Sequence, residues 1–131
     1  MFLGKDYAVF AEVDLSLSGQ VLPLDQHLIF CRDALQHLSY GLIASTLANF
    51  CNSNAIYLLV GSYISAKRNK NRNIAVGLAF SINLLAPPFD FPQPDEIYNE
   101  RTKDGKYLLL YKLSSFCASE NVKLFIKSNK Y

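Results

Sequence analysis

The feature that most constrains the fold is a long run without charge. From residue 34 to residue 66 the chain carries no Asp, Glu, Lys or Arg. An uncharged stretch of this length belongs either in a bilayer, which needs about 20 mostly apolar residues per span, or in a protein core. An Asn-Ser-Asn cluster at 52–54 interrupts the run, and neither half is a clean span. We therefore expect a deeply buried core segment and no membrane span.

The length and composition indicate one globular domain over residues 1–131. About 100–200 residues is the usual size of a domain, and half of this chain is hydrophobic. Nine Phe and eight Tyr argue against a disordered tail. The net charge of +2 divides unevenly along the chain, because residues 34–89 contain four bases and no acid.

The spacing of apolar residues predicts one long helix over residues 24–50. Apolar side chains recur at steps of three and four from Leu24 to Leu42, which is typical of a helix with one buried face. Pro23 suits the first turn of such a helix. The second half is apolar or small on nearly every side, so we expect it to be buried all round.

Alternation of apolar and polar residues, or a run of β-forming residues, predicts strands elsewhere. Asp104-Gly105 between two such runs is a hairpin signal. Four of the five prolines lie in 85–96, which we interpret as an extended connector. The predicted strands are 7–18, 55–66, 74–84, 97–102, 107–113 and 122–127.

These elements give an α+β fold in the order β-α-β-β-β-β-β. An antiparallel β-sheet wrapped around one long apolar helix satisfies this order. The hot-dog fold of acyl-thioester enzymes has the same order, and so does the cystatin-like fold, which is the alternative. The prediction is therefore hot-dog-like, by analogy of element order alone.

The candidate catalytic residues lie at the start of the predicted helix. Asp33 and His37 are four residues apart, so on a helix they share a face and an acid could orient the imidazole as a general base. Asp25, one or two turns earlier, is a second acid. The alternative is an ordinary solvated helix start with Asp25 near the positive end of the helix dipole.

The stretch Arg32-Asp33-Ala34-Leu35-Gln36 resembles the catalytic helix of hot-dog dehydratases, where an acid is followed by Ala and an aliphatic residue. The resemblance implies that Asp33 is the catalytic acid. Those enzymes also use a histidine in the preceding loop, and the loop 18–23 has none here. A thioesterase needs only a carboxylate and a water, so Asp25 or Asp33 could serve in an acyl-thioester hydrolase.

A basic segment follows the second predicted strand. Lys67, Arg68, Lys70 and Arg72 lie within six residues, interleaved with asparagines. They could bind the phosphates of a coenzyme A carrier or of a nucleic acid, or an acidic protein. The alternative is a solvated hairpin tip that protects a sheet edge.

The three cysteines, Cys31, Cys51 and Cys117, are too few and odd in number for a disulfide-stapled scaffold. With no signal-peptide pattern at the start, the simplest expectation is a reducing, cytoplasmic setting. The cysteines and the two histidines match no metal-ligand spacing, so we expect no metal and no resident cofactor.

Two functions of different class follow. The first is a dimeric hot-dog-like domain that binds or acts on an acyl-thioester or similar apolar ligand; the small-residue face at 75–81 would let a second subunit or the ligand come close. The second is a non-catalytic accessory or inhibitor module whose basic hairpin docks on a nucleic acid or an acidic protein. The sequence leaves open whether the protein is an enzyme.

Overall fold

The computed structural model describes residues 12–23, 26–64 and 70–129. In order, the chain forms β1 (Leu28–Cys31), a 3₁₀ turn η1 (Leu35–His37), α1 (Tyr40–Cys51), β2 (Tyr57–Tyr63), β3 (Glu96–Asn99), β4 (Lys106–Lys112), α2 (Leu113–Ala118) and α3 (Glu120–Asn129). The α+β class is confirmed. Among the described residues, however, the sheet has four strands, whereas six were predicted.

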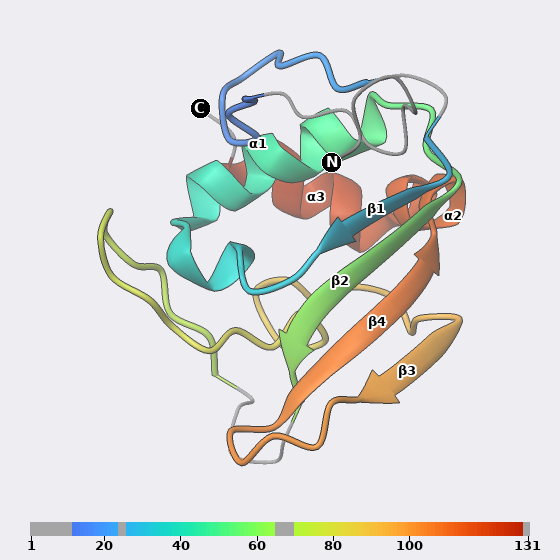
Figure 1. The fold of residues 1–131 in the computed structure, drawn as a ribbon. Helices are drawn as coiled ribbons and strands as arrows, with labels where there is room; N and C mark the ends of the chain where they lie inside the picture. Colours follow the sequence, from blue (N-terminus) through green and yellow to red (C-terminus); the bar gives the residue numbers. More distant parts are fainter. Residues whose placement is uncertain (1–11, 24–25, 65–69, 130–131) are drawn as a thin grey trace, which may run out of the picture.

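The sheet is mixed, not purely antiparallel. Its strand order is β1-β2-β4-β3, and β1 runs parallel to β2 while the other neighbours are antiparallel. The three α-helices lie on one side of it (Figure 1). Leu58, Val60 and Ser62 are buried on β2, whereas the residues between them are more exposed. The sheet therefore has one covered and one open face.

The prediction of one long helix over 24–50 is wrong. Residues 28–31 pair with residues 57–60 as strand β1, and α1 begins only after Ser39, whose side chain accepts a hydrogen bond from the Leu42 N–H. Asp33, with φ of 55°, adopts a left-handed conformation that no α-helix accommodates. The regularly spaced apolar residues belong to different elements: Cys31 of β1 and Leu35 of η1 are buried, whereas Leu28 of β1 is 46% exposed.

The predicted hot-dog-like arrangement is not supported either, because it depends on that long helix. A hot-dog sheet wraps around one long central helix, whereas α1 has 12 residues and packs beside α2 and α3. Within the described ranges, no helix is both long and apolar enough to cross a bilayer. The expectation that the uncharged run forms core is confirmed for α1, where Ile43, Ala44, Leu47 and Phe50 are at most 1% exposed.

Two predicted strands are not strands. Residues 74–84 form an irregular segment in which Val76 and Leu78 are exposed rather than buried. Residues 122–127 belong to helix α3, because Val122 and Phe125, three apart, are both buried while Leu124 is exposed. The first predicted strand is irregular from residue 12 to 18, and its residues 7–11 lie outside the described residues.

The remaining sheet predictions are confirmed with shifted ends. Strand 55–66 corresponds to β2, although its residues 65–66 lie outside the described residues. The pair 97–102 and 107–113 corresponds to β3 and β4. Gly105 has φ of 78° in the turn between β3 and β4, a conformation that suits glycine. The proline-rich connector leads into β3 without regular structure.

A disulfide joins two of the helices. Cys51 ends α1 and Cys117 lies in α2, and their Cα atoms are 5.8 Å apart. The expectation of three reduced cysteines is therefore wrong for this pair, which lies 66 residues apart in the sequence. Disulfides persist mainly in oxidising compartments. The bond favours such a setting over the reducing one that the cysteine count suggested.

Candidate functional site

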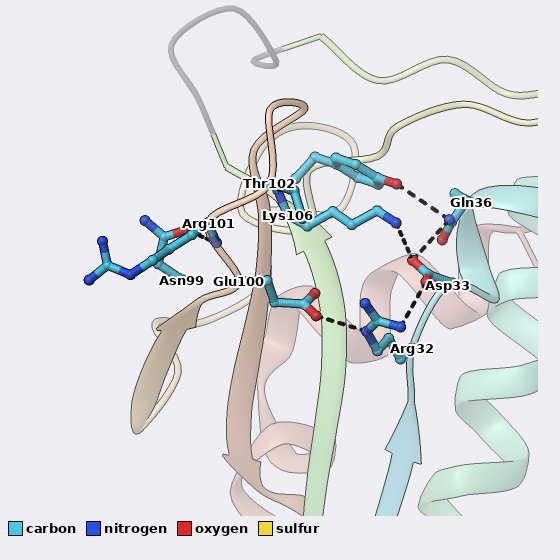
Figure 2. Close-up of polar contacts among 9 residues, drawn as sticks. Arg32, Asp33, Gln36, Asn99, Glu100, Arg101, Thr102 and Lys106 are labelled. Atoms are coloured by element: carbon cyan, nitrogen blue, oxygen red, sulfur yellow. Dashed lines mark hydrogen bonds and ion pairs between the residues drawn. The ribbon is translucent and has the colours of Figure 1, made fainter.

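Asp33 lies in a polar cluster at the end of β1 (Figure 2). Its Oδ1 is 3.0 Å from the Lys106 Nζ, and its Oδ2 is 3.2 Å from the Arg32 guanidinium. Arg32 in turn pairs with Glu100 at 2.8 Å. The cluster thus joins the end of β1 to the start of β4 and to the residue after β3. It holds two cations and two anions, so its charges balance.

Gln36, not His37, bonds to Asp33. The Gln36 side-chain amide donates to Asp33 Oδ1 and to the Tyr63 hydroxyl, each at 3.4 Å. In a helix residue 37 would face residue 33, but here only residues 35–37 form a 3₁₀ turn, and Asp33 lies before it with a left-handed backbone, so helical spacing does not relate the two residues. His37 is exposed. The expected Asp33–His37 pairing is therefore replaced by an amide contact.

The ion pairs favour a fixed carboxylate over a general base. The hydrogen bond from Lys106 is the largest cause that holds the pKa of Asp33 below its ordinary value, and the same contact raises the pKa of Lys106. A general base works best with a pKa near the working pH. Asp33 is also left-handed in its backbone and 36% exposed in its side chain. The ion pairs of Asp33 therefore suit a structural role, in which they hold the end of β1 against the start of β4.

Asp33→Asn should lower the free energy of unfolding only at pH values at which the wild-type carboxylate is ionised. Because the folded-state pKa is lowered, the ionised carboxylate stabilises the protein above pH 3.8, and this contribution disappears as the pH falls through the folded value. We expect a loss below about 1 kcal/mol at neutral pH, since exposed pairs are weak. Asn tolerates the left-handed backbone. Urea unfolding at neutral and at strongly acidic pH measures the difference, and a loss that persists at low pH would assign it to something other than charge.

A separate cavity lies between β1 and α1. Its volume is about 200 Å³ and its walls are mainly apolar, formed by β1, by Phe50 of α1 and by the segment before β1. Leu15, Leu22, Ile29 and Ala34 are among the residues that line it. Arg32 lies at this cavity as well as in the polar cluster, so the two features are neighbours.

Cys31 lines the cavity as an unreactive thiol. It is the one free cysteine of the described residues, and 6% of it is exposed. Burial raises the pKa of the thiol to about 11. A cysteine acts as a nucleophile only as the thiolate. The Cys31 side chain therefore contributes a small apolar surface to the cavity wall.

The basic segment is only partly described. Lys67 and Arg68 lie outside the described residues, and so does the candidate acid Asp25. Lys70 and Arg72 are exposed, and the Arg72 guanidinium carbon lies 4.9 Å from the centre of the Phe80 ring. Neither cation takes part in the Asp33 cluster. The structure therefore does not bring the predicted acidic and basic sites together among the described residues.

Sequence reasoning missed Lys106, which pairs with Asp33, and Glu100, which pairs with Arg32. A weak signal exists: Asp33 is the last acid before the acid-free run, and the nearest following bases lie more than 30 residues away. Its cations therefore had to come from its neighbour Arg32 or from a distant element. Nothing in the sequence identified which element. In the part of the chain that the structure describes, no group of three or more His, Cys, Asp or Glu residues could hold a metal.

Comparison of the chain with protein-family models, with curated proteins and with solved structures found no match.

Proposed function

We propose that this protein is a non-catalytic binding module that holds a short apolar group in the cavity between β1 and α1. The observation that carries the proposal is the cavity itself, whose walls are mainly apolar and include Arg32 as a charged residue. A single apolar pocket with few convergent polar groups is the ordinary form of a small-ligand site. The Arg32 guanidinium already pairs with Asp33 and Glu100, so the polar end of the ligand would face solvent.

The size of the cavity limits the ligand. At about 200 Å³ it is larger than the roughly 150 Å³ engineered cavity that accommodates benzene. It is smaller than the roughly 300–1,000 Å³ of pockets for drug-sized ligands. A short acyl chain, a branched aliphatic group or one aromatic ring fits these limits. The acyl part of a short acyl-thioester also fits these limits, and its carrier would lie outside the cavity.

A binding role is favoured over an enzyme by the state of the candidate catalytic groups. The Asp33 carboxylate is held by Lys106 and Arg32, and the Cys31 thiol has a raised pKa. Neither has the properties of an activated base or nucleophile. Turnover of an acyl-coenzyme A or acyl-carrier substrate that Asp33→Asn abolishes would restore the enzyme hypothesis.

Titration with straight-chain carboxylates of increasing length tests the proposal. Each added methylene should tighten binding about fourfold, which corresponds to about 0.8 kcal/mol, until the cavity is full. Isothermal titration calorimetry on the intact protein measures the series. Affinity that does not depend on chain length would contradict the proposal.

Two variants locate the binding. Ala34→Leu and Ala55→Leu each add a side chain at the cavity wall and should weaken binding of the longest bound ligand about tenfold or more. Ala118→Leu makes the same change at an exposed position of α2 and should leave binding unchanged. Equal effects of all three would place the ligand elsewhere.

A second copy of the chain is one candidate for the open face of the sheet. The disulfide supports a location in an oxidising compartment.

A further inference from the structure

A loop formed by residues 72–80 carries an apolar tip into solvent. It projects away from the sheet and the helices (Figure 1, the yellow-green loop at the left). Val76 is 85% exposed and Leu78 is 58% exposed, and the small residues between and beside them are exposed too. Two large aliphatic side chains at the end of a projecting loop have no role in the core of this chain.

The two ends of this loop are joined by a reciprocal pair of hydrogen bonds. The Asn71 side-chain amide donates to the Asn83 carbonyl at 2.8 Å, and the Asn83 N–H donates to Asn71 Oδ1 at 2.7 Å. The Asn73 side chain also accepts a hydrogen bond from the Tyr40 N–H at 2.8 Å, next to the start of α1. The first half of the loop is therefore fixed to the body of the protein.

The second half is fixed as well. The Phe80 N–H donates to the Gln36 carbonyl at 2.9 Å, and the Arg72 guanidinium stacks over the Phe80 ring. Ile74 is 9% exposed and packs inward below the tip. The exposed aliphatic pair thus stands on an anchored base, which lowers the entropy cost of docking it on another surface.

The charged residues of the loop and of the sequence next to it have one sign. Residues 34–89 contain no acid, and Lys70 and Arg72 lie exposed at the base of the loop. Lys67 and Arg68 precede them in the sequence. A surface that accepts both an aliphatic tip and these cations is apolar inside and anionic outside, as an anionic lipid bilayer is. A nucleic acid would pair with the cations but offers little to Val76 and Leu78.

We propose that the loop 72–80 docks the protein on the surface of an anionic membrane. Val76 and Leu78 enter the interface between headgroups and acyl chains, while Lys70 and Arg72 face the anionic headgroups. This surface is separate from the β1–α1 cavity, so the proposal goes beyond the binding function above and stands or fails independently of it.

Co-sedimentation with vesicles tests the loop. The intact protein should bind phosphatidylcholine vesicles that contain phosphatidylserine, and bind vesicles of phosphatidylcholine alone much more weakly. The double variant V76S/L78S should lose at least about tenfold in partitioning, because it removes most of the buried apolar surface. R72Q should lose about fivefold, the effect of one cation near an anionic surface.

A matched control uses equally exposed aliphatic residues elsewhere. Val21 is 76% exposed and Leu124 is 62% exposed, and V21S/L124S should bind vesicles like the wild type. The proposal is overturned if wild-type protein binds neither vesicle, if both double variants lose equally, or if V76S/L78S binds as well as wild type. A different outcome would assign the cations to nucleic acid instead. In that case the protein would not bind vesicles, and both the wild type and V76S/L78S would bind single-stranded RNA in a salt-sensitive way.

Discussion

Reduction of the Cys51–Cys117 disulfide is expected to lower the free energy of unfolding by about 4 kcal/mol. The two cysteines are 66 residues apart in the sequence, and closing a loop of that length removes a corresponding amount of chain entropy from the unfolded state. The bond also joins the end of α1 to α2, which covers the same face of the sheet (Figure 1). Urea unfolding with and without a phosphine reductant measures the change.

The matched variants separate the disulfide from cysteine packing. C51A/C117A should unfold at the lower denaturant concentration of the reduced protein and should not respond to reductant. C31A, which changes the free buried cysteine, should keep the full response. Three thiols that react with an alkylating reagent in the unfolded, unreduced wild-type protein would show that the disulfide is absent.

Phe89→Ala is expected to cost about 3–5 kcal/mol of stability. Phe89 is 1% exposed, and its ring centre lies 5.4 Å from that of Tyr40 and 4.7 Å from that of Phe125. It therefore connects α1, α3 and the segment before β3. Loss of the ring leaves a cavity and also removes the edge-to-face contacts between aromatic rings.

The same substitution at an exposed ring is the control. Phe30 on β1 is 57% exposed, so Phe30→Ala should change the free energy of unfolding by less than about 1 kcal/mol. Chemical unfolding of both variants gives the two values. A cost for Phe89→Ala no greater than that for Phe30→Ala would mean that Phe89 does not lie in the core.

The sequence correctly predicted the elements whose deciding residues lie within the element itself. β2 is rich in β-forming residues, and the turn at Asp104-Gly105 specified the β3–β4 hairpin. The uncharged run was correctly assigned to the core at α1. In each case the deciding residues lie within one element, so pattern and structure agree.

The failures came from pairings between distant residues. Leu28 to Cys31 fitted a helical stripe, yet these residues gain more by pairing with β2, a partner that the local pattern does not contain. Cys51 and Cys117 meet only because α1 and α2 cover the same sheet face. The candidate site shows the same limit. Asp33 was identified, but Lys106, which pairs with it, and Glu100, which pairs with Arg32, lie far from it in the sequence.

The most direct test of the proposed binding function is the location of a bound ligand in solution. Nuclear Overhauser effects should be recorded between a short straight-chain carboxylate and the methyl groups of the intact, isotope-labelled protein. We expect contacts from the end of the alkyl chain to Leu15, Leu22 and Ile29, which line the β1–α1 cavity. Contacts confined to Val76 and Leu78, or to the open face of the sheet, would contradict it.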